Sequence, residues 1–119
     1  MNNYLQSVFI SLQKQINIIE TSISSENVVI GLDAGTTTQG MNAVAVGLGA
    51  GNNTQGSDAV AIGSGAGAAT QGMNAVAVGY IAGYNTQGTN AVAVGSGTGT
   101  TTQGTNAVAV GNNSGNTSQ

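Results

Sequence analysis

Residues 38–47 decide the fold, and they read Thr-Gln-Gly-Met-Asn-Ala-Val-Ala-Val-Gly. The Thr-Gln-Gly part recurs every 16 residues, beginning at Thr38, Thr54, Thr70, Thr86 and Thr102. A fixed period of this size is typical of a solenoid, in which each repeat forms one coil that stacks on the next. The sequence therefore predicts that this chain provides an extended shape and not a catalytic pocket.

The Ala-Val-Ala-Val part of the repeat has the period of a β-strand. Two columns of the aligned repeats hold only Val or Ile, alanine alternates with them from residue 43 onward, and a glycine follows each run. Because successive side chains of a strand point to opposite faces, one face carries branched residues and the other carries alanine. The branched columns are Val28, Ile30, Val44, Val46, Val60, Ile62, Val76, Val78, Val92, Val94, Val108 and Val110.

Each coil is expected to hold one clear strand, such as Ala43 to Val46, and a shorter strand near Gly49 to Asn53. The Gln-Gly pairs, such as Gln39-Gly40, are expected to form corners, because glycine permits positive φ. Asp58 stands where other repeats carry Asn. That exchange indicates a solvated turn, since three buried carboxylates near a threefold axis would be costly. The variable positions after each strand are expected at the surface: Leu48, Ser64, Tyr80, Ser96 and Asn112.

The first 26 residues have a different period, and they predict a helix. Apolar residues recur there at spacings of 4, 3, 4, 3 and 4 residues, which is a heptad pattern. Isoleucine is prominent in the seam, which favours three or four strands over two. We predict a trimeric parallel coiled coil over 1–26 and a β-roll of six rungs over 27–119. The alternative is an amphipathic helix that packs on its own domain. The seam residues are Leu5, Phe9, Leu12, Ile16, Ile19 and Ile23.

The composition indicates that one chain buries too little apolar surface to be stable alone. The 119 residues include 20 Gly, one Phe, three Tyr and no Trp. Small folds of this kind need metals, disulfides or oligomerisation, and the chain has neither Cys nor His. A homo-oligomer is therefore expected. The net charge of -3 argues against a nucleic-acid partner.

The N-terminal segment lacks the pattern of an export signal, and the polar residues within Tyr4 to Ile23 argue against membrane insertion. A soluble assembly is the expectation from these residues.

The inventory of reactive side chains predicts no enzyme and no cofactor. Without His or Cys, general base chemistry would fall to Glu20, Glu26, Asp33 or Asp58, and none has a partner at a useful spacing. Calcium-binding β-rolls place an acidic residue in every turn. Because the repeats here contain only Asp33 and Asp58, no metal site is expected.

The segments Asn42-Ala43-Val44-Ala45-Val46-Gly47 and Asp58-Ala59-Val60-Ala61-Ile62-Gly63 resemble the head repeats of trimeric autotransporter adhesins (YadA-like). They are also similar to repeats of viral and phage tail fibres. The resemblance covers about residues 28–119, and it implies a left-handed parallel β-roll with three chains side by side. It further implies that the Val and Ile columns fill the interior of each roll, which leaves the alanine face for contacts between chains.

These expectations combine into a rigid trimeric shaft of a fibre or adhesin, at a virion surface or at a cell surface, that supports attachment. Tyr80 and Tyr84 are the only aromatic residues of the repeats. They are either a contact for a receptor or glycan, or ordinary surface variation. Two alternatives stay open: a filament subunit that adds end to end through open terminal coils, and an ice-binding solenoid that presents the threonine column.

Overall fold

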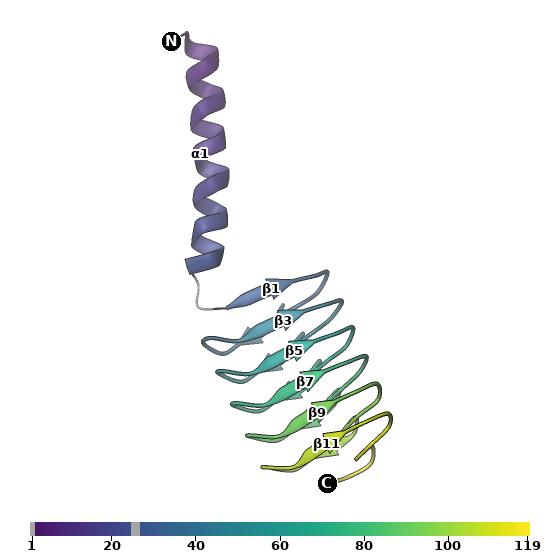
Figure 1. The fold of residues 1–119 in the computed structure, drawn as a ribbon. Coiled ribbons are helices and arrows are strands. Elements are labelled where there is room, and N and C mark those ends of the chain that lie inside the picture. The colour runs from purple at the N-terminus through teal and green to yellow at the C-terminus, as the bar shows by residue number, and fades with distance from the viewer. Residues whose placement is uncertain (1, 25–26) are drawn as a thin grey trace.

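The computed structural model describes residues 2–24 and 27–119 as one helix followed by a stack of short parallel strands (Figure 1). The predicted fold class, a mainly β parallel solenoid after a short N-terminal helix, is confirmed. The domain boundary was expected between residues 26 and 27. Residues 25–26 lie outside the described residues, so the boundary itself stays a prediction.

Helix α1 (Asn3–Ser24) contains 22 residues. Asn2 caps its N-terminus, because the Leu5 N–H donates a hydrogen bond of 2.8 Å to the Asn2 side-chain oxygen. Asparagine is a preferred capping residue, since its side chain satisfies a backbone donor that has no partner within the helix. The helix therefore begins where the sequence places a suitable cap.

The strands form two parallel sheets that stack coil upon coil. Residue pairs in both sheets are 16 positions apart, so Val44 pairs with Val60 and Thr54 with Thr70. The predicted stacking of like residues in columns is confirmed, with about five complete coils. The six-stranded sheet contains β1 (Val28–Ile30), β3 (Val44–Val46), β5 (Val60–Ile62), β7 (Val76–Val78), β9 (Val92–Val94) and β11 (Val108–Val110). The five-stranded sheet contains β2 (Thr38–Gln39), β4 (Thr54–Gln55), β6 (Thr70–Gln71), β8 (Thr86–Gln87) and β10 (Thr102–Gln103).

The position of the second strand was predicted wrongly. The Thr-Gln pairs form it, whereas residues 49–53 form the corner between the two sheets. Gly49 and Gly51 adopt φ values of +64° and +53°, which turn the chain at that corner. The glutamine is therefore the last residue of each short strand and the glycine follows the strand. Within the strand, threonine points outward and glutamine inward.

Alanine, and not valine, fills the interior of the roll. Ala45 and its equivalents Ala61, Ala77 and Ala93 are fully buried, whereas Val44 is half-buried. The assignment of the Val and Ile columns to the core is therefore wrong. The physical reason is space: a side chain added at Gly83 would place its Cβ 3.3 Å from the Ala77 Cβ. Around Ala77 the coil therefore has room for a methyl group but not for a branched side chain, although the larger Thr98 is buried at another interior position of the roll.

Glutamine bridges the two sheets across this narrow interior. The Gln71 Nε2 donates to the Val60 carbonyl at 2.7 Å and to the Ala75 carbonyl at 3.3 Å. Gln55 and Gln87 repeat the arrangement in the neighbouring coils. Their side chains are about 1% exposed, so these hydrogen bonds are made away from water. Each glutamine therefore ties the two-residue strand to the opposite sheet.

We expect Gln71→Leu to lower the free energy of unfolding by about 1–3 kcal/mol, because two hydrogen bonds are lost at a net value of about 0.5–1.5 kcal/mol each. Thr70→Val is the matched control, since Thr70 lies in the same strand with its side chain exposed. Chemical denaturation of both variants measures the difference. Equal stability of Gln71→Leu and the native protein would contradict the bridging role.

The asparagine column lies in exposed turns, as predicted. Asn42, Asp58 and Asn74 all have φ between +57° and +59°. The Asn42 Nδ2 donates to Asp58 Oδ1 at 3.0 Å, and Asn74 donates in the same way to Asn90 at 3.1 Å. Asn and Asp tolerate this left-handed conformation better than other residues with a side chain.

Candidate functional site on the outer surfaces of the roll

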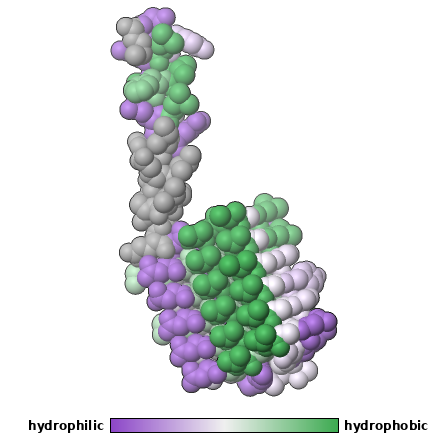
Figure 2. Space-filling view, in the orientation of Figure 1, coloured by the Kyte–Doolittle hydropathy of each residue, from purple (hydrophilic) through white to green (hydrophobic). Residues whose placement is uncertain are grey.

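The most prominent outer feature is a continuous hydrophobic band over the six-stranded sheet (Figure 2). We call it the valine face; it consists of the twelve Val and Ile residues of the two branched columns. In the middle coils these side chains are half-buried, except that Ile62 is 40% exposed, and at the two ends Ile30 and Val110 are 60% and 63% exposed. Monomeric proteins rarely expose a contiguous apolar surface of this kind unless it is a contact site.

The parallel arrangement of the sheet makes this exposure unusual. All-parallel sheets occur almost only where both faces are covered, and their strands then carry near-continuous apolar runs. Here the alanine face is covered by the interior of the roll, and the valine face has no covering element among the described residues. The sheet thus has the composition of a sheet that is buried on both faces, but only its alanine face is buried.

A second exposed apolar surface lies on helix α1. Leu5, Phe9 and Leu12 of the predicted seam are 51%, 54% and 51% exposed. These three side chains do not pack on the roll, which disfavours the alternative of a helix that folds against its own domain. Ile16, Ile19 and Ile23 lie in the helix, but their side chains are outside the described part.

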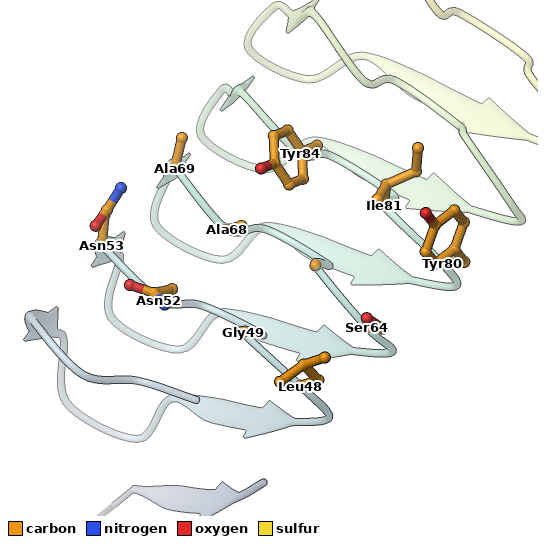
Figure 3. A pocket seen from close by; sticks show the side chains of 11 residues that line it. Leu48, Gly49, Asn52, Asn53, Ser64, Ala68, Ala69, Tyr80, Ile81 and Tyr84 are labelled. Carbon is orange, nitrogen blue, oxygen red and sulfur yellow. The ribbon is translucent and has the colours of Figure 1, made fainter. Parts of the chain in front are cut away.

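A groove runs along the corner that follows the six-stranded sheet, and it contains both predicted tyrosines. Its volume is about 460 Å³, and side chains of three successive coils line it. Figure 3 shows Leu48 and Asn52 from one coil, Ser64 and Ala68 from the next, and the tyrosines from the third. The middle coil is hollow because its lining residues are all small. The structure therefore brings Tyr80 and Tyr84 together in one site.

The threonine column is exposed, as an ice-binding face would be, but it is only one residue wide. Thr54, Thr70 and Thr86 are exposed and in register on the outer side of the five-stranded sheet. Each strand has only two residues, and the second is the inward glutamine. The sheet therefore presents one outward threonine per coil.

Within residues 2–24 and 27–119, no three His, Cys, Asp or Glu side chains gather where a metal ion could be held. No helix in the same residues has both the length and the hydropathy to cross a membrane.

Comparison with known families agrees with this geometry. The model of the YadA head domain repeat matches the chain over residues 45–66, 55–80 and 87–114, which together make up just over half of it. The chain belongs to the YadA head repeat family. No curated protein and no solved structure gives a significant match. The predicted family resemblance is thus confirmed. The resemblance led us to expect the Val and Ile columns inside the roll and alanine outside, and the structure has the reverse.

Two features of this YadA head repeat protein were missed by reasoning from the sequence. One is the inward glutamine column. Its signal in the sequence was that the same Thr-Gln pair recurs in five repeats, and neighbouring residues of a strand point to opposite faces. The other is the groove, for which the signal was the run Ser64 to Ala69 of small residues between two coils with larger ones. Comparing side-chain sizes down each column, one coil at a time, would have found it.

Proposed function

We propose that this chain is a rigid shaft or head segment of a trimeric, adhesin-type surface fibre. The observation that carries the proposal is the valine face, an ordered apolar surface that a single chain leaves open to water. In the assembly, three rolls lie side by side with their valine faces turned inward. The role of the protein is then mechanical, and no residue is assigned a catalytic task.

Coverage of the valine face supplies the stability that the narrow interior lacks. Full burial of one Val or Ile side chain contributes about 1.5–3 kcal/mol, so covering a half-exposed one contributes roughly 1 kcal/mol. Alanine columns inside the roll contribute much less per residue. Association is therefore part of folding for this chain, in the manner of obligate oligomers.

Helix α1 is proposed to add a short parallel coiled coil that aligns the three chains. The exposed Leu5, Phe9 and Leu12 support this role, because they lie on the seam of the heptad pattern. Membership of the YadA head repeat family supports a left-handed roll and an extracellular or cell-surface location. A virion fibre is the other surface setting that suits such a shaft.

The mass in solution tests the proposal. Light scattering coupled to size exclusion is expected to give about three times the 11.5 kDa of one chain, with a β-rich far-ultraviolet spectrum. A compact single chain of 11.5 kDa would contradict it. Masses that grow with protein concentration would instead favour the filament alternative.

A further inference from the structure

We propose that the groove over Tyr80 and Tyr84 binds a neutral saccharide. The inference deepens the proposed adhesin role, because it names the chemical class of what the fibre contacts. It rests on the shape of the groove, its lack of charge, the state of its backbone and the strain at its centre.

The shape of the groove follows from three coils of unequal size. Coils of a parallel stack are about 4.8 Å apart, so the two walls stand roughly 10 Å from each other. The Tyr84 ring leans over the middle coil: a Cβ added at Gly65 would lie 3.3 Å from its Cε2 atom. The volume of about 460 Å³ is within the range of small-ligand sites, about 300–1,000 Å³.

The lining combines aromatic faces with neutral polar groups. Tyr80 is 60% exposed and Tyr84 is 42% exposed, so the groove offers both rings to a ligand. The negative face of an aromatic ring attracts weakly positive groups such as the C–H bonds of a sugar ring. Ser64 and Asn52 add hydroxyl and amide groups that suit sugar hydroxyls.

The groove contains no Lys, Arg, Asp or Glu. An acidic glycan would therefore find no cation to pair with, and a cationic ligand would find no carboxylate. This absence among the lining residues favours a neutral ligand.

The backbone of the groove is not open to an extended peptide. The Asn53 N–H donates to the Ala68 carbonyl at 2.9 Å, and the Ala69 N–H donates to the Tyr84 carbonyl at 2.8 Å. Peptides that bind by strand addition need a free sheet edge, and none exists between paired coils. Recognition here has to come from side chains, as it does for sugars.

A strained residue lies between the two tyrosines. Ile81 adopts a φ of +48°, and it is the only β-branched residue with positive φ among the described residues. The equivalent positions hold Gly49, Gly65 and Gly97, which adopt this conformation without strain, and Asp33 and Asn113, whose residue types tolerate it. Strain of this kind is concentrated at functional sites. It places an aliphatic side chain in the groove where the repeat otherwise has none.

A glycan array tests the proposal with the intact chain of 119 residues. The array holds neutral oligosaccharides of glucose, galactose, mannose and N-acetylhexosamines beside sialylated and sulfated ones. We expect retention of the protein on a subset of the neutral glycans. For the strongest of these, Tyr84→Ala should weaken binding at least about tenfold in titration calorimetry, or about 1.4 kcal/mol. Tyr84→Phe should retain most of the affinity, since it keeps the ring.

Two further variants separate the groove from general effects. Ala68→Tyr fills the hollow and should abolish binding, and the fold tolerates it because Tyr84 occupies the equivalent place one coil later. Tyr4→Ala removes an exposed ring from helix α1 and should leave binding unchanged. Circular dichroism of each variant verifies that the roll is intact.

Four results would overturn the inference: no neutral glycan retained, retention of acidic glycans only, unchanged affinity of Tyr84→Ala, or a changed mass in solution for that variant. The last result would make the groove a contact between copies of the chain. A native protein that is trimeric but binds no glycan refutes this inference alone. A native protein that is monomeric refutes the proposed trimer, whatever the array shows.

Discussion

Val76→Asp is expected to reduce the mass in solution from three chains to one, or to prevent folding altogether. Val76 lies in the middle of the valine face, and its neighbours above and below are Val60 and Val92. In a trimer built on this face, the substitution brings three carboxylates into an apolar contact, where each loses its hydration without gaining a partner. In a single chain the same carboxylate would be half in water, and its cost would be about 1 kcal/mol of strand preference.

Thr86→Asp is the matched control for that experiment. Thr86 belongs to the same coil, is exposed, and lies in the five-stranded sheet, away from the valine face. It adds the same charge to the same stack, so it should leave the mass unchanged. Light scattering of both variants at one protein concentration provides the comparison. A Val76→Asp protein of native mass, or a Thr86→Asp protein that dissociates, would show that the rolls do not meet through this face.

The period of the sequence was sufficient to predict the coils but not which side of them faces inward. The spacing of 16 residues and the alternation of Ala with Val follow from geometry that any stacked strand obeys, and both are found in the structure. The inward side depends on the diameter of the coil, which periodicity does not contain. Hydrophobicity favours valine inside, whereas the available volume around Ala77 and Gly83 admits only alanine. Packing volume decides between them.

Periodicity also does not contain the backbone angles or the reach of side chains between coils, which is why the second strand was misplaced and the groove was missed. The pattern of Gly49 to Asn53 has the small residues of a corner, but a corner and a poor strand differ in φ, which the sequence does not report directly. The tyrosines were recognised as unusual because they are rare in the repeats. Their joint site could not be predicted, because it depends on how far Tyr84 reaches back over Gly65 in the preceding coil.

Gly79→Ala is expected to destabilise the roll by about 3–5 kcal/mol, which combines backbone strain with overpacking. Gly79 has a φ of +130°, a value that residues with a side chain rarely adopt. An added Cβ would also lie 2.5 Å from the carbonyl oxygen of Gly95 in the next coil. Neither problem can relax, because that coil is stacked in register through β7 and β9. Since whole domains are stable by only about 5–15 kcal/mol, the variant should be largely unfolded or proteolysed at 37 °C.

Gly111→Ala separates the two contributions. Gly111 has nearly the same φ, +123°, but the nearest atom to an added Cβ is the Ser114 Cβ at 3.9 Å, because no coil among the described residues lies over it. This variant bears the strain without the clash, so it should lose only about 1–3 kcal/mol. Thermal denaturation of both proteins measures the difference, and equal losses would mean that φ alone demands the glycine. If Gly79→Ala costs more, as we expect, the glycine after each strand is required by the coil above it. Any chain of this family that stacks its coils in this way then needs glycine there in every repeat except one that no coil covers.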